Sequence, residues 1–526
     1  MNLRSCKESC LLGMLLSLFP AVDHAAAQVY PDFAWAAGVN ARGSIVYGAA
    51  LAIDSVGNSY VCGNFNGDVS FGGIILTNKG FFLAKYDPRG RLIWVKQDRN
   101  FGAERNRSAV AADAQGNVYV TGSIFANAGA WGDLLLAKYD SDGDLIWLRQ
   151  TGSDVVDYGS GVAVDKTGNV CVTGVFHLTV LGPLGDPVTD PALQKIFIAK
   201  YNAQGDMLWE KKIVGKGDSL NLGKGIGMDG EGNVYLTGRF VDTNLFGPNM
   251  VSGYGSFLAK YDGAGNLLWA TNASKGMVEG IAVSDQGDSC LVGSSREGIL
   301  TFGNQTLMNP SHNILGFVVK YDRNGNALWA KSISVSPSGP DYSTAVNPMR
   351  IAVDVSGNGY LTGNFSNIAI FGTHQIAIEN DTFGYVYPPD AFIAKCDGNG
   401  NFLWARNIGR GSKEGIGVAI DAEGSAYLTG NFGGELTLGK TILESYGPSF
   451  FVTQLPALYL TALDRPVRFG LAAESGRECV IEYSRDLTRW FGLVTNTMPA
   501  SGFLEFNHGI ISVPDQLFYR ARSVSP

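Results

Sequence analysis

Two thirteen-residue phrases recur along this chain, and their spacing constrains its fold more than any other feature. The first begins at residues 51, 110, 162, 226, 281, 351 and 418, for example as VAADAQGNVYVTG and IAVDVSGNGYLTG. The second follows in six copies, for example as FLAKYDPRGRLIW at 82–94 and FLAKYDGAGNLLW at 257–269. A repeat of this length cannot bury its own apolar faces, so neighbouring copies must pack on one another.

Each phrase has the pattern of a β-hairpin. An Asp-x-x-Gly turn stands between two apolar runs, and it predicts a type I turn that the Asp side chain caps, with glycine in the left-handed region. Two hairpins in succession make a four-stranded antiparallel meander, which is the blade of a β-propeller. We therefore predict an all-β fold, a seven-bladed β-propeller followed by a small β-sandwich.

The outer strands predict how the ring closes. Six copies of the second phrase end in tryptophan, whereas the seventh third strand, Phe451–Leu455, runs into Pro456 and has no partner after it. Trp35 stands near the start of the chain in a strand-like segment without a partner of its own. We expect this N-terminal strand to complete blade seven, which removes an exposed edge. A linear β-solenoid is the alternative, but it would need no missing strand.

The paired phrases resemble the SBBP-type bacterial seven-bladed β-propeller repeat across about residues 29–455. This resemblance implies an exported repeat protein. It implies no catalytic residues, because the shared motif contains none.

The tail lacks both phrases and carries six strand-like runs between Tyr459 and Arg522. The segments VIEYSRDLTRW and FYRAR resemble small C-terminal immunoglobulin-like or fibronectin type III-like modules of exported bacterial proteins. Together these features predict three segments: a signal peptide at 1–27, the propeller at 28–455 and a β-sandwich module at 456–526.

The first residues have the pattern of an export signal. Arg4 and Lys7 precede the apolar run Leu11–Phe19, and small residues end at Ala27, where we place the cleavage. The apolar run is too short to span a bilayer, and we expect no transmembrane segment in the mature chain. The predicted location is outside the cytoplasm: secreted, periplasmic or associated with the cell surface.

Charge and cysteine usage exclude some classes of protein. The net charge is −8 and no run of like charges occurs, so nucleic acid is not an expected partner. The five cysteines beyond the signal are widely spaced, and four of them replace a threonine or tyrosine of the repeat. We interpret them as small buried residues and expect neither disulfides nor metal ligation.

A calcium site is the one metal hypothesis that the repeats raise. Asp140, Asp142 and Asp144 echo the first half of a calcium-binding loop, but no distal carboxylate follows them. We favour turn chemistry there and expect no cofactor. The lysine of each AKYD phrase is likewise interpreted as structural, with its stem on apolar surface and its charge paired locally.

The segments opposite the turns differ from blade to blade and are the predicted recognition surface. Long inserts lie at 177–195, 242–256, 332–349 and 373–390. Five aromatic residues in them are candidates for stacking on a ligand: Tyr254, Tyr342, Phe383, Tyr385 and Tyr387.

These features favour a non-enzymatic recognition or scaffold protein, monomeric, that binds a protein or polysaccharide through the irregular face. One alternative is a carbohydrate-active propeller enzyme, a lyase or glycosidase, using insert carboxylates such as Asp242 and Asp341. Glycosidases need two facing carboxylates at a defined separation, which the sequence does not supply. A purely structural envelope component is the other alternative, because fold alone does not choose among these functions.

Overall fold

The computed structural model describes residues 32–524 of this 526-residue chain, with gaps. The gaps are residues 40, 42, 100, 103–107, 125–131, 153–156, 178–193, 214–220, 242–245, 247–252, 311–312, 337–344, 379–388, 410–411, 458, 465–467, 474–475, 485–490, 500–501 and 508–517. The chain divides into two compact units, with a boundary between Tyr459 and Leu460. The predicted signal peptide, 1–27, lies outside the described residues.

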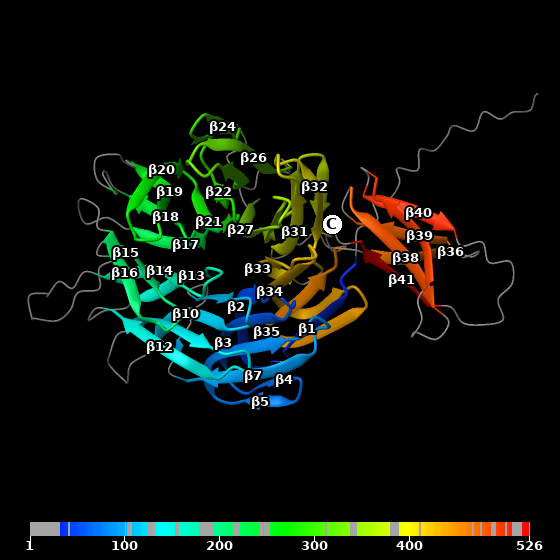
Figure 1. The fold of residues 1–526 in the computed structure, drawn as a ribbon, viewed down its shortest axis with the longest axis horizontal. Helices are drawn as coiled ribbons and strands as arrows, with labels where there is room; N and C mark the ends of the chain where they lie inside the picture. Colours follow the sequence, from blue (N-terminus) through cyan, green and yellow to red (C-terminus); the bar gives the residue numbers. More distant parts are fainter. Residues whose placement is uncertain are drawn as a thin grey trace, which may run out of the picture. The chain divides into compact units, whose positions relative to one another are not determined.

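The first unit is a ring of seven antiparallel sheets, which confirms the predicted propeller (Figure 1). In six blades the four strands follow one another along the chain, from the innermost to the outermost. Blade one consists of β2 (Ile45–Ile53), β3 (Ser59–Asn66), β6 (Lys79–Tyr86) and β7 (Leu92–Asp98). Blade two consists of β9 (Ala109–Ala112), β10 (Val118–Ile124), β11 (Asp133–Tyr139) and β12 (Leu145–Thr151), with β8 (Phe101–Gly102) added to β10.

The next four blades repeat this arrangement. Blade three has β13 (Tyr158–Val164), β14 (Val170–His177), β15 (Gln194–Tyr201) and β16 (Met207–Ile213), and blade four has β17 (Leu222–Met228), β18 (Val234–Val241), β19 (Tyr254–Tyr261) and β20 (Leu267–Ser274). Blade five has β21 (Met277–Val283), β22 (Ser289–Ser295), β25 (Leu315–Tyr321) and β26 (Ala327–Val335), and blade six has β27 (Val346–Val353), β28 (Gly359–Phe365), β31 (Asp390–Cys396) and β32 (Phe402–Asn407).

Blade seven joins the two ends of the ring. It contains β33 (Ser412–Ile420), β34 (Ala426–Leu438) and β35 (Thr441–Leu455), and its outermost strand is β1 (Trp35–Gly38). β1 and β35 pair antiparallel, with Trp35 opposite Gln454 and Gly38 opposite Phe451. The predicted closure by the N-terminal strand is therefore confirmed, and the part of β35 from Phe451 to Gln454 is not left as a free edge.

The Asp-x-x-Gly turns have the predicted geometry. In the first of them the Asp54 carboxylate accepts hydrogen bonds from the backbone N–H groups of Val56 and Asn58, at 3.0 and 2.9 Å. Gly57 closes the turn with φ of +86°, a conformation that glycine adopts without steric cost. The Asn58 side chain and the Tyr60 hydroxyl donate to the second carboxylate oxygen. The carboxylate of Asp54 is thus used within the hairpin that it caps.

These turns make the fold sensitive to acid. Burial alone would raise the pKa of Asp87, but hydrogen bonds from the Arg91 backbone and side chain outweigh it and hold this pKa below its usual range. A carboxyl whose pKa is lower in the folded state stabilises the fold above its unfolded pKa, and this contribution is lost as the pH falls toward the folded value. The same sign applies to Asp165, Asp229, Asp322 and Asp397.

We expect Asp87→Asn to lower the free energy of unfolding by about 1 kcal/mol at neutral pH, because it removes the ionic contact with Arg91 while keeping an acceptor for the turn amides. The difference from the wild type should begin to shrink below about pH 4, near the pKa of an unfolded aspartate, and should vanish as the pH falls through the lower pKa of the folded state. Urea unfolding at several pH values measures this. A difference that stays constant with pH would contradict the assignment.

Trp and Lys side chains of the second phrase form hydrogen bonds between neighbouring blades. Trp94 Nε1 and Lys85 Nζ of blade one donate to the same acceptor, the Ser141 carbonyl in a turn of blade two, at 3.0 and 2.9 Å. Trp147 and Lys138 of blade two share the Ala203 carbonyl of blade three in the same way. The lysines are structural as predicted. Lys260 pairs with Asp229 of its own blade at 3.3 Å, while Lys85 and Lys138 donate across the blade interface.

Trp35 extends this series through the closure. Its Nε1 donates to the Pro88 carbonyl of blade one at 3.0 Å, in the role that Trp94 and Trp147 have elsewhere. The closing strand therefore supplies both the missing backbone pairing and the missing contact between blades.

In three blades, a phenylalanine followed by glycine stands at the tip of a small hairpin between the second and third strands. These hairpins are β4 (Val69–Phe71) with β5 (Ile74–Leu76), β23 (Ile299–Phe302) with β24 (Gln305–Met308), and β29 (Ile368–Phe371) with β30 (His374–Ala377). Phe71, Phe302 and Phe371 are buried against phenylalanines of the third strands, with ring centroids about 5 Å apart. These buried phenylalanines anchor the small hairpins in the core, and β29 additionally pairs with the outer strand β26 of the preceding blade.

The remaining predictions for this unit concern cysteines and membrane segments. Cys62, Cys171, Cys290 and Cys396 are buried free thiols, and burial raises the pKa of each. The part of the chain that the structure describes contains no helix of the length and hydropathy needed to cross a bilayer.

The second unit contains all six strands expected in the tail. One sheet has the order β36 (Tyr459–Asp464), β37 (Arg468–Ala472) and β40 (Phe503–Asn507), and the other has β39 (Phe491–Thr497), β38 (Glu478–Ser484) and β41 (Phe518–Ser523). Leu471, Cys479 and Ile481 are among its buried residues. This is the small β-sandwich that the sequence predicts.

Candidate functional site in the central channel

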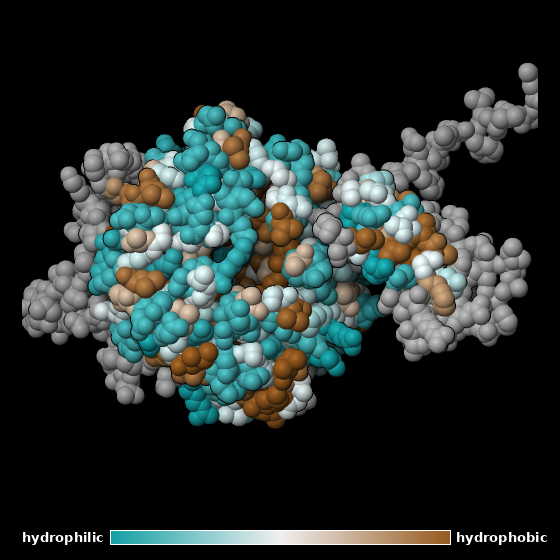
Figure 2. Space-filling model, in the orientation of Figure 1, coloured by the Kyte–Doolittle hydropathy of each residue, from teal (hydrophilic) through white to brown (hydrophobic). Residues whose placement is uncertain are grey.

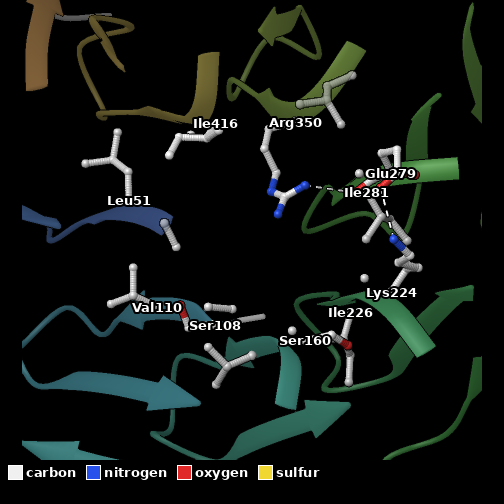
Figure 3. Close-up of a pocket in the computed structure, with 18 of the residues that line it drawn as sticks. Leu51, Ser108, Val110, Ser160, Lys224, Ile226, Glu279, Ile281, Arg350 and Ile416 are labelled. Atoms are coloured by element: carbon white, nitrogen blue, oxygen red, sulfur yellow. Dashed lines mark hydrogen bonds and ion pairs between the residues drawn. The ribbon is translucent and has the colours of Figure 1, made fainter. Parts of the chain in front are cut away.

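The innermost strands of all seven blades line a cavity of about 170 Å³ on the axis of the ring. One aliphatic residue from each blade contributes to its wall, and each stands at the first position of the repeated hairpin phrase: Leu51, Val110, Val162, Ile226, Ile281, Ile351 and Val418. Six of these seven side chains are only 7–9% exposed, so they form a tightly packed collar. Figure 2 shows the hollow near the centre of the propeller, and Figure 3 shows its lining.

Polar side chains line the cavity from five consecutive blades, two to six. They are Ser108, Ser160, Lys224, Glu279 and Arg350. Lys224 Nζ lies 3.2 Å from Glu279 Oε2, which makes an ion pair between blades four and five. The Arg350 guanidinium points into the cavity, where its Nη1 donates to the carbonyls of Glu279 and Met349 at 3.1 and 2.8 Å (Figure 3).

β-Bulges aim three of these side chains at the channel. The pairing register of the innermost strand skips one residue in each of these blades, and the skipped residues are Ser160, Lys224 and Glu279. A bulge leaves its extra residue outside the ladder and redirects its side chain, here toward the axis. Since each bulge lies near the start of its strand and the Asp-x-x-Gly turn follows the strand's end, the polar group lies on the side of the collar away from the turns.

Arg350 occupies a position that is otherwise kept small. The residue directly before the collar position is Ala or Gly in the other six blades, for example Ala50, Gly225 and Gly417. A Cβ atom at Gly225 would come within 2.8 Å of Ile281 Cγ2, because the inner strands approach closely there. Arg350 is thus the single long side chain at this level of the channel, where its neighbours have at most a methyl group.

The cavity has a net positive charge of one. Its charged lining residues are Lys224, Arg350 and Glu279, two cations and one carboxylate. Burial lowers the pKa of Arg350 and the Glu279 carboxylate opposes this effect, yet a guanidinium stays protonated under all conditions that proteins tolerate. The other part of the wall, from blades seven, one and two, presents Ile416, Leu51 and Val110 together with the small side chain of Ser108 (Figure 3). The cavity is therefore cationic on one side and mainly aliphatic on the other.

Of the five aromatic candidates, the structure describes one. Tyr254 begins β19 and is 51% exposed; its hydroxyl donates to Glu297 Oε1 at 3.4 Å, and Lys275 Nζ lies 5.5 Å from its ring centroid. Tyr342, Phe383, Tyr385 and Tyr387 lie outside the described residues, as do Asp242 and Asp341.

The Asp140 loop has the same turn geometry as the other blades. Asp140 Oδ1 accepts the backbone N–H groups of Asp142 and Asp144, both at 2.9 Å, and Asp144 pairs with Lys96 at 2.9 Å. Within the described residues, no group of three or more His, Cys, Asp or Glu is placed to hold a metal ion.

The channel residues were missed by reasoning from the repeats, which concentrated on what the copies share. Their signal is a departure from the pattern: an arginine at 350 where other copies have Ala or Gly, and charged residues at 224 and 279 just ahead of the collar position. The repeats themselves place these positions at the innermost strand.

The fold and the channel define a closed seven-bladed β-propeller with a small polar cavity on its axis. No protein-family model matches the chain. The uncharacterized WD repeat-containing protein L264 of Acanthamoeba polyphaga mimivirus is 25% identical over 377 residues, which cover 58% of this chain. The match covers 27% of that protein, so this chain corresponds to about a quarter of its relative's length.

Solved structures with a similar arrangement are also propellers. The WD40 domain of Pan2 from Neurospora crassa has a TM-score of 0.41 at 10% identity, with 80% of this chain and 96% of that domain covered. The Dos1 propeller has a TM-score of 0.43 at 9% identity, with 81% and 94% covered. These similarities are distant, and the fold assignment rests on the strand pairing of this chain itself.

Proposed function

We propose that this chain is an exported, non-enzymatic recognition or scaffold protein that binds a protein or glycan partner through the propeller face opposite the Asp-x-x-Gly turns. The observation that carries the proposal is the difference between the two faces. On the turn face, the aspartates use their carboxylates within their own turns, toward the lysine of their own blade, and in places toward a neighbouring blade. The other face carries the blade-specific sequence, the long inserts and the polar side of the channel.

The described channel lining supports binding rather than hydrolysis. Its single carboxylate is Glu279, and this group is paired with Lys224. A glycosidase needs a second carboxyl group at a defined distance across the substrate, which this lining does not provide. Tyr254, half-exposed at the start of a third strand, is the described residue of this face best suited to stack on a sugar ring or a peptide side chain.

Export and the family resemblance complete the proposal. The pattern of residues 1–27 supports a secreted, periplasmic or cell-surface location, and the repeat phrases support membership of the SBBP-type propellers. The sheets of the second unit are compatible with the immunoglobulin-like or fibronectin type III-like module that its sequence resembles.

A binding and hydrolysis screen with the full chain tests the function. We expect retention of a glycan on an array, or of a protein from the same cell envelope, without release of reducing sugar from a panel of polysaccharides. Tyr254→Ala should weaken this retention by about fivefold or more, because an aromatic platform contributes roughly 1 kcal/mol or more. Val355→Ala, at a fully solvated position on the turn face, is the control and should leave it unchanged.

The other outcomes would each contradict the proposal. Polysaccharide cleavage would favour the enzyme. Loss of binding with Val355→Ala and not with Tyr254→Ala would show that the partner binds the turn face instead. A chain that retains neither glycan nor protein would favour a purely structural envelope component.

A further inference from the structure

The guanidinium of Arg350 has hydrogen-bond donors left over inside the channel. Its Nη1 is used by two backbone carbonyls, at 3.1 and 2.8 Å. Nε and Nη2 donate to no group among the described residues, and an arginine side chain has five N–H donors in a fixed plane. These donors face the cavity, so the free edge of this guanidinium is open to an acceptor from outside the chain.

The charge balance at the site calls for an anion. Glu279 is the one carboxylate in the described lining, and its Oε2 pairs with Lys224 rather than with Arg350. Arg350 contacts the backbone of Glu279, and among the described residues no carboxylate forms an ion pair with its guanidinium. One monovalent anion would neutralise the site. A free guanidinium edge donates two parallel hydrogen bonds to a planar group with two oxygen atoms, such as a carboxylate.

The size and the other wall of the cavity limit what this anion can be. Its volume of about 170 Å³ is close to that of an engineered cavity of ~150 Å³ that holds benzene, and well below the ~300 Å³ of the smallest drug-sized pockets. Leu51 and Val110 lie across this space from Arg350, and Ile416 lies beside that arginine (Figure 3). The ligand must therefore combine one charged head with a short apolar body.

We propose that the central channel is a binding site for a small monocarboxylate with a short aliphatic or aromatic body. The carboxylate lies against Nε and Nη2 of Arg350, and the body lies against the aliphatic wall of blades seven, one and two. Phosphate fits less well because it carries more charge than the site neutralises and has no apolar part. This inference does not depend on the partner proposed for the loop face.

Calorimetry with the full chain and butyrate as the probe tests this proposal. We expect one butyrate per chain, with much weaker binding of three matched compounds: 1-butanol, which lacks the charge, butylammonium, which reverses it, and inorganic phosphate, which lacks the apolar body. Equal binding of butanol and butyrate would overturn the role of the guanidinium. Tighter binding of phosphate than of butyrate would overturn the ligand class, and no binding of butyrate would overturn the site.

Two substitutions in the site give opposite predictions. Arg350→Ala should weaken butyrate binding about tenfold or more, since hydrogen bonds to a charged group contribute roughly 1.5–3 kcal/mol. The position accepts alanine in blade one as Ala50, so the fold should survive. Glu279→Gln should strengthen binding severalfold, because it removes the competing negative charge. A purely structural role for these residues would not produce a gain in affinity.

A control variant and a conservative one complete the test. Arg323→Ala removes a half-exposed arginine that pairs with Glu231 on the turn face, and should leave butyrate binding unchanged. Arg350→Lys keeps the charge but loses the planar pair of donors, so its affinity should fall between those of the wild type and Arg350→Ala. Unchanged affinity for butyrate in both Arg350 variants would contradict the proposal.

Discussion

Deleting the closing strand, residues 31–38, is expected to open the ring and lower the free energy of unfolding by about 4 kcal/mol. The deletion removes four antiparallel pairs with β35, the Trp35 Nε1 hydrogen bond to the Pro88 carbonyl, and the contact of the indole with Gly90. It also exposes the edge of β35, which becomes a template for pairing with another chain. Denaturant unfolding and light scattering measure the two effects.

A conservative variant separates the strand from its side chain. Trp35→Phe keeps the backbone pairing and most of the apolar contact but loses the hydrogen bond to Pro88, so we expect a cost of about 1 kcal/mol without self-association. If the deletion were no more destabilising than this substitution, closure of the ring would contribute little to the stability of the propeller.

Gly293→Ala is expected to cost about 3 kcal/mol, which is large for the addition of one methyl group. A Cβ at this position would lie 2.0 Å from the backbone oxygen of Met277 and 2.7 Å from Cζ of Phe317. The oxygen belongs to the neighbouring strand next to the bulge, so relief requires the innermost strand itself to move. The thermal midpoint and the urea midpoint of unfolding measure the loss.

Gly298→Ala in the same blade is the matched control. The nearest atom to its added Cβ would be the Asn309 oxygen at 3.9 Å, an ordinary contact, so the change should stay within about 0.5 kcal/mol. Equal costs at positions 293 and 298 would show that the close approach at the bulge is relieved by small shifts. The same steric reason applies to the corresponding glycines at positions 63, 174, 238, 363 and 430.

The repeats made most of the architecture predictable. Asp-x-x-Gly fixes a local turn whatever surrounds it, and seven copies fix the number of blades. The role of Trp35 followed from counting outer strands, because a strand with the tryptophan that recurs in the other outer strands, but with no neighbour in sequence, needs a partner elsewhere. Register within a hairpin follows from the turn, as the confirmed geometry at Asp54 and Gly57 illustrates.

The channel was not predictable in the same way. Ser160, Lys224 and Glu279 reach the axis because bulges skip one residue, and a bulge depends on tertiary approach between strands rather than on local preference. The pairing of Lys85 and Lys138 across blade interfaces likewise depends on where the next turn lies in space. Such contacts join residues about sixty positions apart, which no local pattern encodes.

The shared acceptors between blades have a consequence for how the molecule comes apart. A single carbonyl of one blade holds both the tryptophan and the lysine of the blade before it, at Ser141, Ala203 and Arg323, and Trp35 carries the linkage across the junction of the termini. An open array of repeats can fray from its tips, one unit at a time. A closed ring whose blades are joined by such hydrogen bonds has no terminal unit that can unfold first. Backbone amides in all seven blades should therefore exchange with solvent at a common slow rate set by global opening.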